Sequence, residues 1–148
     1  MQLKIKKLHP DAVIPKYATP GSACFDLHAV DCGQQTPVWG CQPVTFRTGL
    51  SFEIPTGYAI KIYSRSGHGF KNAVRLSNVV GIIDSDFRGE VMVRLTCDDA
   101  QLDVLRVNPG DRIAQAMLVP VEQVEFLEVD DLSSTSRGSG GFGSTGSA

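Results

Sequence analysis

The strongest constraint on the fold of this chain is a series of short segments in which apolar and polar side chains alternate. In residues 50–54 and 58–62 every second side chain is apolar, and Pro55-Thr56-Gly57 lies between the two segments. Alternation with a period of two is typical of a half-buried β-strand, and a connection with Pro and Gly favours a hairpin. The sequence has no long amphipathic helix and no β-α-β rhythm. It therefore predicts an all-β sandwich, barrel or jelly roll.

Further strands are predicted where the pattern returns, at residues 3–5, 23–27, 79–83, 91–95, 102–107, 113–121 and 124–129. Residues 64–71 are polar and contain glycines, which favours a loop, and residues 72–76 are compatible with a turn of helix. Asn108-Pro109-Gly110-Asp111 has Pro and Gly at the central positions of a type II turn.

Residues 78–95 combine two apolar segments with a polar connection, and this arrangement predicts a second hairpin. The connection contains Asp84, Asp86, Phe87 and Arg88. An ordinary core hairpin with charges at its tip is one interpretation. The other is a functional site, because carboxylates, an arginine and an aromatic ring at one strand end can deprotonate, bind and stack.

The composition is that of one soluble domain: 148 residues, of which 42% are hydrophobic and 20% charged. The net charge of −2 gives no reason to expect nucleic acid or an anionic membrane as a partner. No apolar run could span a bilayer, and the first residues lack the apolar stretch of a signal peptide, so we expect a cytoplasmic protein.

The cysteines and histidines show no metal-binding or disulfide pattern. Cys24, Cys32, Cys41 and Cys97 form no CxxC pair, and we expect reduced thiols. The three histidines form no HExxH motif, and neither a Walker loop nor a Rossmann GxGxxG follows a strand. We expect residues 1–132 to form the β domain. Residues 133–148 are rich in Gly and Ser and are expected to form a flexible arm.

Five separated stretches resemble the five motifs of the homotrimeric dUTP pyrophosphatases (dUTPases), in the order of that family. They are residues 21–27 (GSACFDL), 65–67 (RSG), 78–89 (NVVGIIDSDFRG), 110–115 (GDRIAQ) and 137–146 (RGSGGFGSTG). The resemblance implies a jelly-roll-like β-barrel or sandwich that assembles as a homotrimer with shared active sites. It also implies Mg²⁺-dependent hydrolysis of dUTP to dUMP and diphosphate, which would limit uracil incorporation into DNA and supply dUMP for dTMP synthesis.

The resemblance also implies roles for residues of the third motif. Asp84 matches the general base that activates the water attacking the α-phosphorus. Uracil would be read largely by main-chain groups of the residues around it, with Met92 lining the same slot. The stacking surface of Phe87, where the family more often has tyrosine, would lie under the deoxyribose and exclude a 2′-hydroxyl. The uracil-reading residues implied are Asn78, Gly81, Ile82, Ile83 and Asp84.

The other motifs match groups that hold the triphosphate and the metal. Arg65, Ser66 and Gly67 would bind phosphates, and Gln115 would lie near them. Asp26 would hold Mg²⁺ through water, with the triphosphate as the main ligand.

The fifth motif matches an arm that closes over the nucleotide. Phe142, followed by Gly143, would cover uracil, and Arg137 would meet the terminal phosphate.

The sequence departs from the family pattern at Cys24, Ser64 and His68, which stand where glycine, proline and an aliphatic residue are usual. These departures affect loop rigidity rather than the chemical groups of the mechanism. Two alternatives remain: an enzyme resembling dCTP deaminase, which shares the fold, and a non-catalytic β module.

Overall fold

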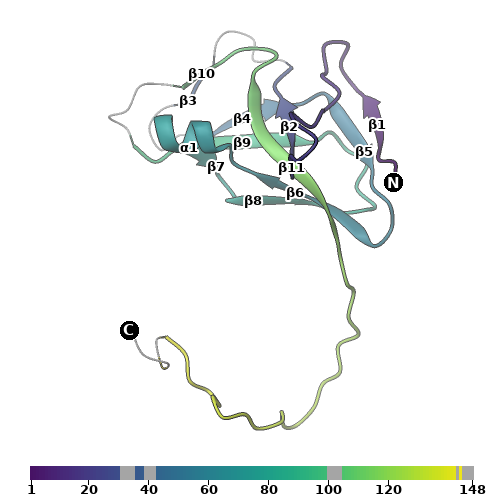
Figure 1. Ribbon diagram of the computed structural model, residues 1–148, viewed down its shortest axis with the longest axis vertical. Coiled ribbons are helices and arrows are strands. Elements are labelled where there is room, and N and C mark those ends of the chain that lie inside the picture. The colour runs from purple at the N-terminus through teal and green to yellow at the C-terminus, as the bar shows by residue number, and fades with distance from the viewer. Residues whose placement is uncertain (31–35, 39–42, 100–104, 143, 145–148) are drawn as a thin grey trace.

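The computed structural model describes residues 1–30, 36–38, 43–99, 105–142 and 144 (Figure 1). Within these residues short strands predominate and one short helix occurs, as expected for an all-β fold. The strands are β1 (Lys4–Lys7), β2 (Phe25–His28), β3 (Thr36–Val38), β4 (Val44–Arg47), β5 (Leu50–Glu53), β6 (Tyr58–Tyr63), β7 (Val74–Leu76), β8 (Val80–Ile83), β9 (Met92–Cys97), β10 (Leu105–Val107) and β11 (Arg112–Pro120), and the helix is α1 (Ser66–Asn72).

The strands form a four-stranded sheet in the order β2-β11-β6-β8, a three-stranded sheet β4-β9-β7, and the pairs β1-β5 and β3-β10. All of these pairings are antiparallel. Residues from several strands form one core, which includes Phe46, Leu50, Ile60, Leu95 and Ile113, each at most 1% exposed. This burial explains why a period of two recurs along the chain.

Both predicted hairpins have the expected strands but the wrong pairing. β5 pairs with β1, whereas β6 pairs with β11 and β8. β8 likewise pairs with β6, whereas β9 pairs with β4 and β7. The connections at residues 54–57 and 84–91 therefore pass from one sheet to another. Alternation shows which face of a strand is buried, but the choice of partner depends on contacts with distant segments.

The helix also differs from the expectation. α1 covers most of the segment predicted as a loop, and the helix predicted at residues 72–76 is wrong. Ala73 adopts a left-handed conformation (φ 50°), and its N–H bonds the carbonyls of His68 and Gly69, which ends the helix. Val74 and Leu76 are then buried on β7. With seven residues α1 cannot cross a bilayer, and the described residues contain no other helix that could.

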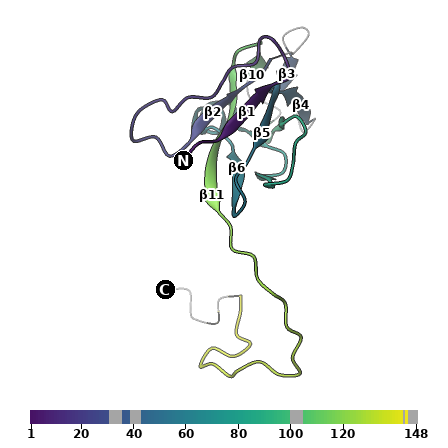
Figure 2. The same cartoon turned by 90° about the vertical axis from the view of Figure 1, so that its right-hand side faces the viewer.

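After Pro120 the chain leaves the body as an extended segment, which is clear in Figures 1 and 2. The strand predicted at residues 124–129 is not formed. Val124, Phe126 and Leu127 are 67%, 92% and 82% exposed, so nothing within the described part of this chain covers their apolar surface. A strand needs a neighbour to pair with its backbone groups, and this segment has none among the described residues.

Candidate functional site

Asp26 on β2 is the centre of a charged network built from three distant parts of the chain. Its Oδ1 accepts a hydrogen bond from Nε of Arg65 at 2.9 Å, and its Oδ2 accepts one from Nη1 of Arg112 at 3.3 Å. Arg65 directly precedes α1, and Arg112 begins β11. The side chains of Asp26 and Arg65 are only 18% and 23% exposed, so this pair is more strongly held than a surface pair.

Gln115 lies beside this network because β11 pairs with β2 and β6. Gln115 is opposite Asp26 on one side and Tyr63 on the other. Its Nε2 donates to the carbonyl of Ser64 at 2.9 Å, and the Ser64 hydroxyl accepts from the N–H of Leu76 at 2.9 Å. Ser64, one of the departures from the family pattern, thus connects the end of β6 to β7.

A cavity of about 330 Å³ brings together four of the predicted site residues. They are Asp26, Arg65, Ser66 and Gln115. The remaining lining residues are Ala18, Ser22, Ala23, Cys24 and Arg112. Guanidinium, hydroxyl and amide groups are donors that can bind an oxyanion such as phosphate.

Sequence reasoning gave no role to Arg112, His68 or His28, although all three belong to this region. His68 bonds the carbonyl of Arg112 through Nε2 at 2.7 Å and so fixes the start of β11. Burial lowers the pKa of His28 below its usual value, with Asp26 partly opposing this shift. Burial, and next Asp26, raises the pKa of the Cys24 thiol. The signal for Arg112 was its place in the GDRIAQ motif.

The donor set limits how a metal ion could be held. Both oxygens of Asp26 already accept bonds from guanidinium groups. The described residues contain no group of three or more His, Cys, Asp and Glu side chains that could hold a metal ion. Asp26 is the carboxylate of this cavity that could contact Mg²⁺ through water.

Asp84 lies at the other end of the four-stranded sheet, directly after β8, and is exposed. No hydrogen bond or ion pair to its carboxylate occurs within the described residues, so both oxygens are free. Asp84 and Ile82 line a separate cavity of about 690 Å³, together with Lys61 of β6 and residues that follow β11.

The register of β6 and β8 gives the separation of these two clusters. Ile83 is opposite Ile60, so Asp84 lies beside Ala59. Arg65 is six residues further along, which at the rise of an extended strand is about 20 Å. A general base must lie within hydrogen-bond distance of the attacking water, about 3 Å between heavy atoms, and that water would lie beside the same triphosphate that Arg65 would bind. One chain therefore does not bring Asp84 together with Arg65.

The residues that the family resemblance assigns to uracil and to deoxyribose lie on β8 or close to its ends. β8 is the edge strand of its sheet, so backbone groups on its outer side have no strand partner among the described residues. At the start of β8 the N–H of Val80 donates to the carbonyl of Asn78 at 2.6 Å, which forms a three-residue γ-turn. Its central residue, Val79, has a φ of 63°, a strained conformation for a β-branched residue. A Cβ on Gly81 would lie 3.2 Å from Cβ of Ile62, so this site favours glycine.

Phe87 and Met92 leave large apolar surfaces open, at 42% and 55% exposure. Phe87 lies in the connection after β8, and Met92 begins β9.

In the arm, Nε of Arg137 donates to the carbonyl of Gly140 at 2.9 Å, and Phe142 is fully exposed. The segment that follows β11 extends away from the body (Figure 1). Gly143 of the arm lies outside the described residues. At Gly67, in the second motif, a Cβ would meet nothing within 4 Å, so no neighbour in the structure requires glycine there.

Comparisons with known proteins agree over nearly the whole chain. The dUTPase family model matches residues 10–146. The deoxyuridine 5'-triphosphate nucleotidohydrolase of Nautilia profundicola is 44% identical over 146 residues, which cover 99% of each chain. That of Helicobacter pylori strain J99 is 41% identical over 99% of this chain and 97% of the relative.

Solved structures give the same fold at lower identity. A point mutant of the dUTPase of Staphylococcus bacteriophage 80alpha, with dUpNHpp, has a TM-score of 0.83 at 22% identity over 99% of each chain. A point mutant of the dUTPase from phage phi11 of S. aureus, described with a structural Mg(II) ion, has a TM-score of 0.74 at 19% identity. The match covers 88% of this chain and 98% of the phage chain.

Proposed function

Since this chain belongs to the dUTPase family, we propose that it hydrolyses dUTP to dUMP and diphosphate through a water activated by Asp84. The observation that carries the proposal is the single cavity that collects Asp26, Arg65, Ser66 and Gln115 from three of the family's motifs. These residues are far apart in sequence and supply the donors that a triphosphate needs.

In this proposal the triphosphate lies in the cavity beside Arg65 and Ser66. Arg65 keeps its orientation because its Nε donates to Asp26 and its Nη1 donates to the carbonyl of Arg112 at 3.5 Å, which leaves Nη2 for phosphate oxygens. Gln115 is fixed in the same way by the Ser64 carbonyl. Asp26 would hold Mg²⁺ through water, and the ion would supply positive charge that offsets the charge of the phosphates. Groups that are oriented in advance lower the entropic cost of the reaction.

Asp84 is suited to its role because its carboxylate is exposed and has no partner among the described residues. An ionised carboxylate can orient a water and accept its proton as the oxygen attacks the α-phosphorus. The outer edge of β8, which has no strand partner among the described residues, can offer N–H and C=O groups to uracil, with Asn78 before the strand and Met92 beyond it. Cytosine carries the reverse pattern of donor and acceptor and would leave buried groups unpaired.

The distance of about 20 Å between Asp84 and Arg65 within one chain supports active sites shared between subunits. We propose a homotrimer in which Asp84 of one subunit faces the phosphate cavity of the next. The outer face of the four-stranded sheet carries Lys61, Ile82 and Met117 in one row of the register and extends between the two clusters. This face is the surface on which a neighbour can bring them together.

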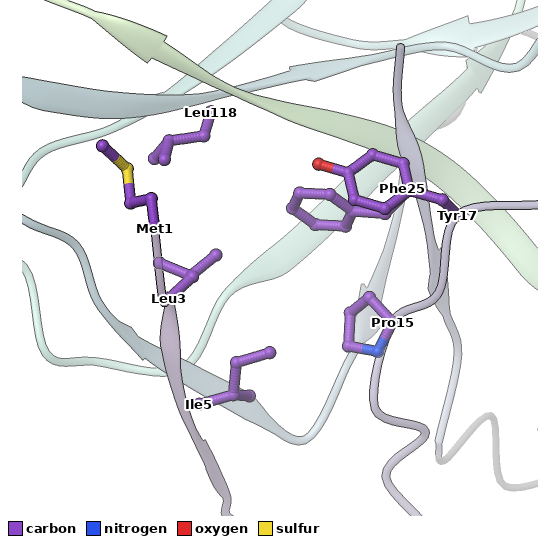
Figure 3. Close-up of a pocket in the computed structure, with 7 residues that line it drawn as sticks. All are labelled: Met1, Leu3, Ile5, Pro15, Tyr17, Phe25 and Leu118. Atoms are coloured by element: carbon purple, nitrogen blue, oxygen red, sulfur yellow. The ribbon is translucent and has the colours of Figure 1, made fainter. Parts of the chain in front are cut away.

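Two further apolar surfaces support an oligomer. An open groove of about 330 Å³ is lined by Met1, Leu3 and Ile5 on one side and by Pro15, Tyr17 and Phe25 on the other, with Leu118 near Met1 (Figure 3). The rings of Tyr17 and Phe25 meet edge to face at 5.9 Å. The exposed Val124, Phe126 and Leu127 are the second surface. Burial of both in an assembly would be favourable.

We further propose that the arm closes over the bound nucleotide, with Phe142 on uracil and Arg137 on the terminal phosphate. Its glycines allow it to fold on binding, and closure would exclude bulk water.

The enzyme would act in the cytoplasm, where it would limit uracil incorporation into DNA and supply dUMP for dTMP synthesis.

The test is diphosphate release from dUTP, dCTP, dTTP and UTP with Mg²⁺, each repeated with excess chelator. We expect rapid release from dUTP alone and loss of activity on chelation. Ammonia release from dCTP would instead indicate a deaminase, and inactivity toward all four nucleotides would indicate a binding module.

A further inference from the structure

The connection after β8, residues 84–89, is held in shape by an arginine of its own. Nη1 of Arg88 donates to the carbonyl of Ser85 at 2.7 Å and to that of Phe87 at 3.0 Å. The N–H of Phe87 in turn donates to the carbonyl of Asp84 at 3.2 Å. The main-chain bond closes a turn whose first residue is Asp84 and whose fourth is Phe87, and one guanidinium nitrogen binds two carbonyls of this turn.

The far side of the same connection is anchored to the body. The hydroxyl of Ser51, a residue of β5 that is only 5% exposed, donates to the carbonyl of Arg88 at 2.7 Å. Two residues on, the carboxylate of Glu90 accepts from the N–H of Gly49 at 2.8 Å and from Nε of Arg47 at 3.0 Å. These bonds hold the main chain at Arg88 in place. Its side chain extends from this anchored position toward the carbonyls of Ser85 and Phe87.

Gly89 completes this arrangement by leaving room for a ring. A Cβ at residue 89 would lie 2.6 Å from Cζ of Phe87, which is closer than van der Waals contact allows. The Phe87 ring therefore occupies the space that any side chain at residue 89 would take. Arg88 holds the backbone of the ring-bearing residue, and Gly89 permits its side-chain position.

We propose that Arg88 is a positioning residue that fixes Asp84 and Phe87 in their working geometry before substrate binds. The inference rests on the proposed function only in so far as Asp84 is the base and Phe87 the sugar contact. Arg88 acts through two main-chain hydrogen bonds rather than through its charge. A carboxylate that must meet one water molecule gains from such support, because a displacement of about 1 Å can cost about 10²-fold in rate.

Two substitutions separate the hydrogen bonds from the charge. Arg88→Gln removes the charge but keeps an NH₂ group with two donors, whereas Arg88→Met removes both and keeps an unbranched side chain. Arg88 is exposed, so both variants should fold, and their melting temperatures check this. If the bonds matter, Arg88→Gln stays within about threefold of the parent in kcat, and Arg88→Met loses about 10- to 100-fold. The dUTP-to-UTP preference of Arg88→Met should also fall.

Hydrogen exchange of the nucleotide-free proteins gives a second readout that does not depend on activity. Amides of residues 85–89 should exchange faster in Arg88→Met than in the parent or in Arg88→Gln, while β6 and β9 stay unchanged. Parent-like exchange and kcat in Arg88→Met would overturn the proposal. Equal loss of kcat in both variants with unaltered exchange would also overturn it and would assign Arg88 to phosphate binding. A parent that does not hydrolyse dUTP would refute the proposed function, while the exchange result would still stand.

Discussion

Mixing two inactive variants tests whether the active site is shared between subunits. Asp84→Asn removes the base and keeps the shape of the side chain, so hydrolysis should fall by about 10²–10⁴-fold while dUTP still binds. Arg65→Ala removes charge-assisted donors to phosphate, which should cost about 10- to 100-fold. Asp26 keeps its bond to Arg112 in the second variant, so its carboxylate is not left alone.

The expected activity of the mixture follows from the separation of the two residues. If Asp84 and Arg65 of one site come from neighbouring subunits, every trimer that contains both variants has both intact residues in one of its three sites. The purified mixed trimers should then show about a third of the parent activity. If each subunit carried a whole site, the mixture would show only the mean of the two variants, at most about 5% of the parent from the losses expected above.

The assay needs true mixed oligomers. The two variants carry different affinity tags and are unfolded and refolded together or made together in one cell, and the doubly tagged fraction is purified. Diphosphate release from saturating dUTP is then measured per subunit. The controls are each variant refolded alone and the two variants mixed without unfolding.

Two results would refute the reasoning. Activity equal to the mean of the separate variants, in a fraction shown by mass to contain both chains, would place each site within one subunit. Full activity of the parent under conditions where it is monomeric by light scattering would do the same. Either result would mean that the chain rearranges to bridge about 20 Å within one subunit.

Three further predictions concern the sugar contact, the arm and the fold. Phe87→Ala should lower the ratio of kcat/KM for dUTP to that for UTP, and an unchanged ratio would show that another residue excludes the 2′-hydroxyl. Truncation after Leu132 should leave folding and oligomeric mass intact but abolish most activity. Phe142→Ala alone should lower kcat/KM about 10- to 100-fold, since a stacked base is worth about 1–3 kcal/mol; parent-like turnover would show that the arm has no role. Gly49→Ala should lower the free energy of unfolding in denaturant titrations by about 2–4 kcal/mol, because φ is 65° and the new Cβ would lie 2.8 Å from Cβ of His9. Gly57→Ala is the matched control, with φ at 82° but open space around it, and should cost only about 1–2 kcal/mol; equal losses would contradict the clash.

Turn chemistry and strand faces could be predicted locally. The type II turn prediction agrees with the structure, in which the N–H of Asp111 bonds the carbonyl of Asn108 at 3.0 Å and Gly110 has a φ of 88°. Ile60 and Ile62 face the core, as their alternation with Lys61 predicts. These features depend on the preferences of one to four residues, so the chain carries them in short stretches.

Strand partners could not be predicted in this way. The segments on either side of Pro55-Thr56-Gly57 look like a hairpin, yet β5 and β6 belong to different sheets. Each strand pairs with the segment that best completes a common core, and that segment can lie anywhere in the chain. The segment at residues 124–129 has a strand pattern but no partner within the described part of its own chain.

By itself the sequence determined which chemical groups this protein carries and, through five motifs in order, the family to which it belongs. Only the tertiary structure decided how those groups meet. It joins Asp26 to Arg65 and Arg112, which are 39 and 86 residues away, and leaves Asp84 at the opposite end of the same sheet. The physical reason is that motifs record local chemistry, whereas distances between motifs depend on strand register and core packing summed over the whole chain.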